Sequence, residues 1–220
     1  MRPDTRPPFV AAPTSEPQRS GPGAVGLPSR LRRTMTITET VYPTDRAAWR
    51  RWLAANHATA PEIWLVTYRK AAGRPSLPYN DAVEEALCFG WVDSTRKAMG
   101  AERLAQRFTP RRAGSGYSRI NVERLRRLVG QGLVLPEVEA AVADLLAAPF
   151  VIPPDIEAAL RANAAAWAHF QRFSEAYRHI RVAHVDAARD RPEEFERRLA
   201  RLLAKTEAGK QFGYGIEAYY

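Results

Sequence analysis

The chain has 220 residues, a hydrophobic content of 45% and a formal net charge of +9. This composition is sufficient for a globular core, and the single cysteine, Cys88, excludes an internal disulfide. No run of about 18 apolar residues is present, which excludes a membrane-spanning helix. We therefore expect a soluble protein in a reducing compartment, the cytoplasm.

Residues 1–40 are predicted to be a disordered leader. Residues 1–34 hold seven of the 17 prolines and six arginines, with almost no apolar pattern. The segment lacks the apolar core of a secretory signal. Because Met35 opens a more ordinary sequence, we hypothesise that translation begins there.

Residues 41–134 are predicted to form a small α+β unit. Trp49, Trp52 and Leu53 share one face of a predicted helix that Thr44 would cap. The β-branched and aromatic run at 63–68 predicts a buried strand. A further helix is expected to begin at a capping box formed by Asp81 and Glu84 and to end at Gly90, the residue before the next strand.

Two strands at 91–98 and 103–109 are expected to form a hairpin, with Leu104, Gln106 and Phe108 on one face of the second strand. A basic loop with glycines follows, and Ser118 would cap a helix to residue 130. In that helix Arg119, Glu123, Arg126 and Arg127 are predicted to face water, and Leu125 and Leu128 to face inward.

The remainder of the chain is predicted to be all helix. It divides into a linker with a helix at 135–151, a helical module at 152–213 and an aromatic tail at 214–220. The helix from Pro192 is the clearest, because acidic residues fill its first turn and basic residues its end. The fold class is therefore α+β: a mixed helix and antiparallel-strand half followed by an all-helical half.

The positive charge is concentrated in one short stretch. Residues 96–127 carry ten basic residues against Glu102 and Glu123, whereas the chain after residue 127 is slightly acidic. Such a stretch attracts anions, although the abundance of arginine expected of a GC-rich genome explains it equally well. Arginine forks, the glycine-bearing loop and the following helix start together favour an anion site. The predicted ligand-binding residues are Trp91, Asp93, Arg107, Arg111, Arg112, Tyr117, Ser118, Arg119 and Asn121.

Catalytic and metal chemistry find little support. Cys88 lies on the same predicted helix face as Glu84 and Asp81, whose charges disfavour a thiolate, so a buried structural cysteine is expected. Asp93 is expected to pair with Arg107 or Arg111 across the hairpin. The four histidines do not share a helix face or a ligand spacing, so neither a metal nor another cofactor is predicted.

Three motifs resemble those of a known family. They are DAVEEALCFGWVD at 81–93, RLAQRFTPRR at 103–112 and SGYSRINVER at 115–124, and the segments 152–155, 173–178, 197–199 and 209–210 extend the likeness. The chain is identified by these motifs as resembling the YdeI/OmpD-associated (bacteriocin-protection) family. That resemblance implies protection against bacteriocins or cationic antimicrobial peptides, and a link to an outer-membrane porin, without implying a reaction.

Three functions remain open. The first is a non-enzymatic bacterial stress or protection protein that binds an anionic ligand or acidic partner through its arginine-rich surface. The second is a small-molecule binder or enzyme with a pocket between the two halves, formed by Glu84, Asp93, Arg107 and Ser118. The third is a nucleic-acid-binding protein, since aromatic residues interleave with the basic stretch.

Overall fold

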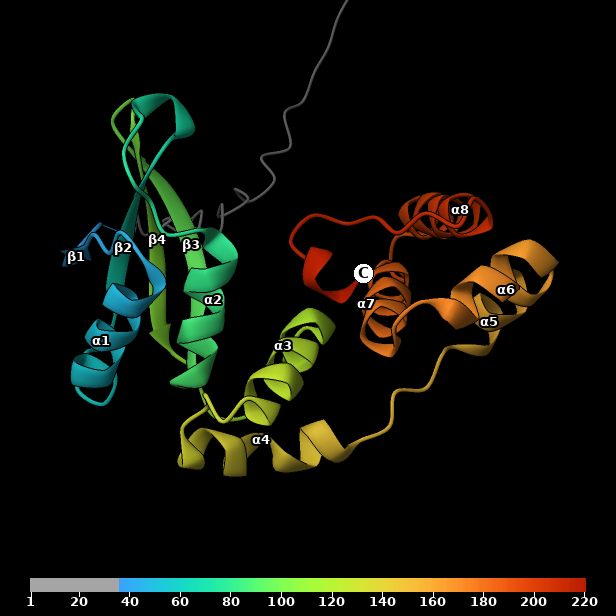
Figure 1. Ribbon diagram of the computed structural model, residues 1–220, viewed down its shortest axis with the longest axis horizontal. Coiled ribbons are helices and arrows are strands. Elements are labelled where there is room, and N and C mark those ends of the chain that lie inside the picture. The colour runs from blue at the N-terminus through green and yellow to red at the C-terminus, as the bar shows by residue number, and fades with distance from the viewer. Residues whose placement is uncertain (1–35) are drawn as a thin grey trace, which may run out of the picture. The chain divides into compact units, whose positions relative to one another are not determined.

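The computed structural model describes residues 36–220, so most of the predicted leader and the proposed start at Met35 lie outside the described residues. The elements are coloured along the chain in Figure 1. They are β1 (Thr40–Val41), α1 (Arg46–Asn56), β2 (Ile63–Tyr68), the 3₁₀ turn η1 (Lys70–Ala72), α2 (Tyr79–Cys88), β3 (Trp91–Met99), β4 (Arg103–Pro110), α3 (Arg119–Gly130), α4 (Pro136–Ala147), α5 (Pro154–Arg161), α6 (Ala164–Arg172), α7 (Glu175–Asp186), α8 (Pro192–Glu207) and the 3₁₀ turn η2 (Glu217–Tyr219).

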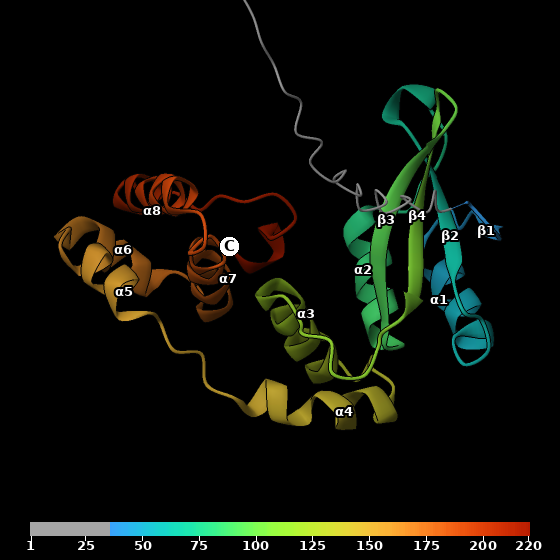
Figure 2. The ribbon, with the colours of Figure 1, turned by 180° about the vertical axis from the view of Figure 1, so that it is seen from behind.

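A four-stranded mixed sheet organises the first half. Its strand order is β1-β2-β4-β3, with β1 parallel to β2 and the other pairs antiparallel. Helices α1 and α2 both lie against the same face of the sheet, as the front and back views agree (Figures 1 and 2). Helices alone follow β4, so the predicted α+β class with an all-helical second half is confirmed.

Two predicted helix starts are wrong in detail. Helix α1 is capped by Asp45 rather than Thr44, because the Asp45 carboxylate accepts a hydrogen bond from the Ala48 backbone N–H at 2.8 Å. Helix α2 begins at Tyr79, so Asp81 lies in its first turn and no capping box forms with Glu84. Tertiary ion pairs use the Glu84 side chain instead.

Buried charge joins α1, α2 and α3. Glu84 and Glu85 on α2 are 7% and 2% exposed. Glu85 accepts from Arg46 and, at 2.7 Å, from Arg50, both on α1. Glu84 accepts from Arg46 at 3.1 Å and from Arg127 on α3. The arginines thereby neutralise carboxylates that would otherwise be costly to bury.

Helix α3 also contacts the second half of the chain. Glu123, which the sequence pattern predicted to face water, is 4% exposed because it lies against α7 and accepts from His179 Nδ1 at 3.0 Å. Arg124, also 4% exposed, donates to Asn80 at 2.7 Å and to the Gly215 carbonyl at 3.4 Å. A helix packed on two sides has no fully solvated face, which explains the error.

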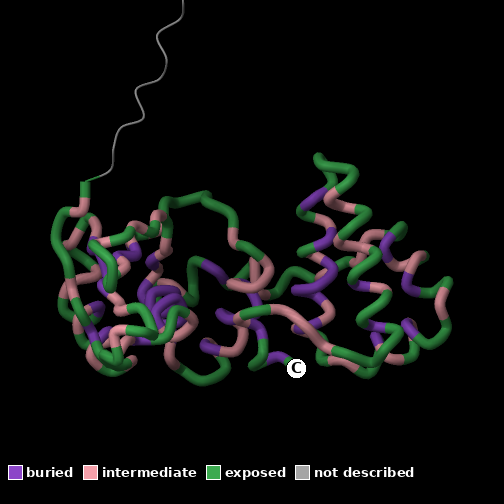
Figure 3. Tube along the Cα trace, turned by 90° about the horizontal axis from the view of Figure 1, so that it is seen from above, coloured by how far each residue is buried: buried purple, intermediate pink, exposed green. Residues whose placement is uncertain are grey.

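Three apolar clusters form the core, and the buried positions are purple in Figure 3. The first fills the space between the sheet, α1, α2 and α4, and the second lies among α5 to α8. The third joins Tyr177 and Ile180 of α7 to Ile216 and Tyr219 of the C-terminal segment. The predicted aromatic tail is therefore packed, with only part of it exposed.

Gly90 connects α2 to β3 in a left-handed conformation, with φ of 69°. A Cβ atom at this position would lie 3.2 Å from Val138 Cγ2 of α4. Both the backbone and the close approach of α4 thus favour glycine here. In the part of the chain that the structure describes, no helix is both long and apolar enough to cross a membrane.

The Glu85→Ala variant is expected to lose about 2 kcal/mol of unfolding free energy, because it leaves Arg46 and Arg50 without their shared carboxylate. Both arginine side chains are about one-third exposed, which keeps the cost below that of a fully buried pair. Urea unfolding followed by circular dichroism measures the change. The exposed Glu193→Ala variant should stay within about 0.5 kcal/mol of the native protein, and an equally small loss at Glu85 would contradict the role of the network.

Candidate ligand-binding site

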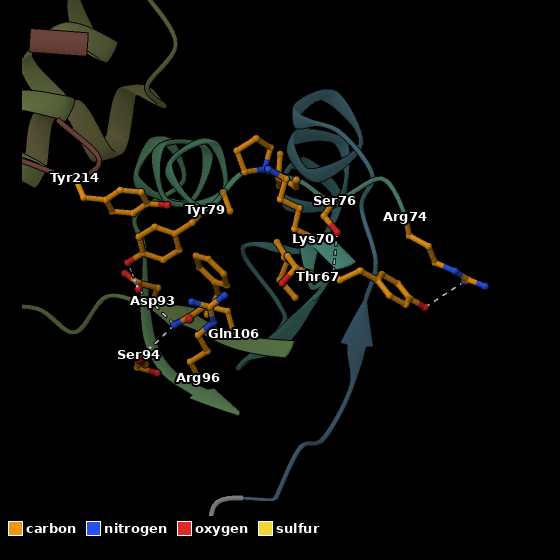
Figure 4. A pocket seen from close by; sticks show the side chains of 16 residues that line it. Thr67, Lys70, Arg74, Ser76, Tyr79, Asp93, Ser94, Arg96, Gln106 and Tyr214 are labelled. Atoms are coloured by element: carbon orange, nitrogen blue, oxygen red, sulfur yellow. Dashed lines mark hydrogen bonds between the residues drawn. The ribbon is translucent and has the colours of Figure 1, made fainter. Parts of the chain in front are cut away.

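A cavity of about 760 Å³ opens at one end of the sheet, beside the first turn of α2. Its floor is apolar and comes from β2, β4 and the segment before α2, with Leu65, Phe108 and Leu77. Polar side chains surround this floor, as Figure 4 shows. The size and the mixture of an apolar floor with a few polar groups are typical of small-molecule sites.

An irregularity in β3 brings two charged side chains to this cavity. Asp93 pairs with Phe108 of β4, and Arg96 pairs with Gln106, so the register shifts between them. In a regular strand, residues three apart point to opposite faces. The extra residue of the bulge lets Asp93 and Arg96 both line the cavity.

Asp93 is the acidic residue of the lining and is held by two neighbours. Its Oδ2 atom accepts from the Tyr79 hydroxyl at 2.8 Å and from Gln106 Nε2 at 3.4 Å (Figure 4). Gln106 also donates to the Ser94 carbonyl at 3.3 Å. Both side-chain bonds to Asp93 reach Oδ2, so among the described residues Oδ1 is left to accept from a ligand.

The electrostatics of the cavity are mixed. Burial and the neighbouring Asp93 carboxylate raise the pKa of Tyr79 to about 12, so its hydroxyl remains a hydrogen-bond donor at neutral pH. Lys70 and Arg96 are exposed cations at the rim. Arg74 is also in the lining, but its guanidinium donates to the Tyr68 hydroxyl at 3.3 Å. The Asp93 carboxylate inside the cavity is thus bordered by the positive charges of Lys70 and Arg96 at the rim.

Only one of the nine predicted site residues, Asp93, lines this cavity. Asp93 also lines a neighbouring cavity of about 270 Å³, together with Ser118 and Asn121 at the start of α3. Ser118 stands at the N-cap position but makes no side-chain capping bond. Asn121 accepts from Arg124 at 3.0 Å. The structure thus brings three of the nine residues together.

Two predicted site residues have structural contacts instead. Trp91 is 1% exposed, packs edge-on against Trp52 and donates to the His57 carbonyl, so it cannot stack on a ligand. Arg107 donates from Nε to Glu62 at 2.8 Å, so the expected pairing of Asp93 with Arg107 is wrong.

The predicted basic loop is largely ordered by its own contacts. The Arg111 guanidinium lies 3.8 Å from the centre of the Tyr117 ring and donates to the Gly116 carbonyl, so it does not pair with Asp93. The exposed Arg112 supplies its backbone carbonyl to Ser115. Arg119 lies 3.4 Å from Glu123 and 4.5 Å from the Phe150 ring.

Lys70, Tyr79, Arg96 and Gln106 line the cavity although they were not among the residues predicted from the sequence. A signal was available for Gln106, because a polar side chain between Leu104 and Phe108 on an inward strand face needs a polar partner. No comparable signal marked Arg96, since its orientation depends on the bulge. Within residues 36–220, no three histidine, cysteine, aspartate or glutamate side chains gather as metal ligands would.

These features define a two-part α+β protein with a small-molecule-sized cavity in its first part. Residues 149–209 match the family model described as "Bacteriocin-protection, YdeI or OmpD-Associated", and residues 41–141 match "Domain of unknown function (DUF8412)". Residues 149–209, which include α5 to α8, therefore form a bacteriocin-protection (YdeI/OmpD-associated) domain, as the likeness at 152–155, 173–178 and 197–199 predicted. The three motifs between 81 and 124 lie in the part that matches the domain of unknown function. No match was found among curated proteins or among solved structures.

Cys88 is fully buried, and burial together with the Glu85 charge raises the pKa of its thiol to about 11. At pH 8 the thiol is therefore almost wholly protonated, and we expect Ellman's reagent to label it only after unfolding in urea. Stoichiometric labelling of the native protein within minutes would contradict the structural role. Labelling measured over a pH series tests the direction of the pKa shift, since the labelling rate of the native protein should increase only toward pH 11.

Proposed function

We propose that this chain is a non-enzymatic binding protein that holds a small organic molecule in the cavity beside α2. The Asp93–Tyr79–Gln106 cluster carries the proposal, because it presents a carboxylate oxygen over an apolar floor. The family match supports a role in bacterial protection. Such a role would be indirect, through a ligand that reports or relieves stress, since a basic protein is a poor trap for cationic peptides.

The lining favours one type of ligand. Asp93 calls for a hydrogen-bond donor such as an ammonium or hydroxyl group. The apolar floor favours a ligand with an apolar middle part, because it consists of Phe108, Leu65 and Leu77. Lys70 at the rim favours a carboxylate or phosphate at the other end of the ligand. The proposed ligand is therefore a small amphipathic acid that also carries a donor group.

The distribution of arginine contacts argues against the nucleic-acid alternative. Half of the ten basic residues between 96 and 127 make ion pairs with Glu62, Glu84 or Glu123; these are Arg107, Arg119, Arg124, Arg126 and Arg127. A charge already paired with a carboxylate attracts phosphate weakly. These five arginines therefore contribute little to a surface for a nucleic-acid backbone.

A thermal-shift screen with amino acids, hydroxy acids and their phosphorylated derivatives tests the proposal. A ligand that raises the melting temperature of the native protein should bind the Asp93→Asn variant about tenfold more weakly, because the amide loses the charge on the acceptor. The exposed Asp190→Asn variant removes the same charge elsewhere and should retain full affinity. Equal affinity of a hit for native and Asp93→Asn protein would refute the assignment of the site.

A further inference from the structure

A second cavity, of about 830 Å³, lies among α7, α8, the start of α3 and the C-terminal segment. It is separate from the cavity proposed above as the main site, although Tyr214 contributes to both linings. Its charged lining consists of five arginines, Arg119, Arg181, Arg197, Arg198 and Arg201, against the single carboxylate of Glu194. The lining thus carries a formal charge of +4 when His184 is neutral.

Arg181 is the unusual member of this group. It is 7% exposed, yet its Nε atom is buried without a hydrogen-bond partner. Within residues 36–220, no carboxylate pairs with it, and its guanidinium lies 3.9 Å from the centre of the Phe212 ring. A contact with an aromatic face compensates only part of the cost of burying a cation.

The carboxylates around the cavity are too few to neutralise its arginines. Glu194 accepts from both Arg197 and Arg198, the latter at 2.5 Å, and so serves two cations. The Arg201 guanidinium lies 5.2 Å from the centre of the Phe212 ring, which Arg181 also contacts. Arg201 has no ion pair with any described residue. Arg119 already shares Glu123 with Arg126. Arg181 and Arg201 are therefore the two cations that lack a carboxylate.

The excess positive charge also acts on His184 in the same lining. Desolvation and the charges of Arg181, Arg198 and Arg201 lower the pKa of its imidazole to about 4. Burial and the charges of Arg201 and Arg198 likewise lower the pKa of Arg181. An anion that enters the cluster would reduce the part of this destabilisation that comes from repulsion between the cations.

We propose that this arginine cavity is an anion site for a phosphate-bearing small molecule, held by Arg181 and Arg201 with Ser118 at its edge. Two guanidinium groups can form paired hydrogen bonds to phosphate oxygens. The ligand supplies the charge that Arg181 lacks within the described chain. The Phe212 ring is covered by guanidinium groups and is not open to stack on a ligand. The phosphate would therefore bind the arginines, and the organic group attached to it would lie in the outer part of the cavity.

The test uses inorganic pyrophosphate as the probe, with sodium chloride at matched ionic strength as the reference. Isothermal titration calorimetry on the full chain should show saturable binding that weakens about tenfold or more in Arg201→Gln, because one charge-assisted contact is lost. Arg201 is exposed, so this variant should fold normally. The Arg51→Gln variant removes an exposed arginine on α1, which does not line this cavity, and it should bind pyrophosphate as the native protein does.

Arg181→Met distinguishes a ligand site from a structural arginine. We expect it to abolish pyrophosphate binding while the ligand-free protein melts at the same or a higher temperature, because an uncompensated buried charge has been removed. In the native protein, pyrophosphate should also raise the pKa of His184 from about 4, as followed by imidazole NMR signals. No saturable binding, equal binding by Arg201→Gln, or an unchanged His184 pKa at saturation would each overturn the proposal. Binding to the cavity at Asp93 is measured separately through Asp93→Asn, which leaves this site intact.

Discussion

The packing of α1, α2 and α3 against one another is constrained by two buried carboxylates, Glu84 and Glu85 of α2. Isolated carboxylates at this depth would be strongly unfavourable, so α2 can occupy its position only where arginines surround it. Arg46 and Arg50 of α1 approach from one side and Arg127 of α3 from the other. The requirement for these partners restricts how α1 and α3 lie against α2, and Tyr79 and Ala82 of α2 line the sheet cavity.

Helix α3 extends the same type of contact into the second half. Its Glu123 lies against His179 of α7, and its Arg124 reaches both α2 and the C-terminal segment. The arginine-rich composition thus serves two purposes that sequence alone cannot separate. Most arginines of the basic stretch bind carboxylates of the protein itself, whereas Arg181 and Arg201, which lie outside that stretch, have no carboxylate among the described residues.

The two cavities differ in chemistry because different elements build them. The sheet cavity combines an apolar floor with one acidic residue, positioned by a bulge in β3. The arginine cavity lies between helices and carries one carboxylate for five cations. The C-terminal segment borders both, and Tyr214, which is 92% exposed, lies in both linings. The exposed Tyr214 of this segment thus borders both proposed binding cavities.

The sequence by itself determined the α+β class, the strands predicted at 63–68, 91–98 and 103–109, the family of the C-terminal helices and the buried character of Cys88. Local periodicity and turn residues predict the elements, whereas the family was predicted from the likeness of short sequence motifs. Only the tertiary structure decided which charges are free. Glu123 faces α7 and Arg107 faces Glu62 because of long-range packing. A one-residue bulge sets the direction of Arg96, and long-range packing places the Arg181 guanidinium against the ring of Phe212, 31 positions later in the chain.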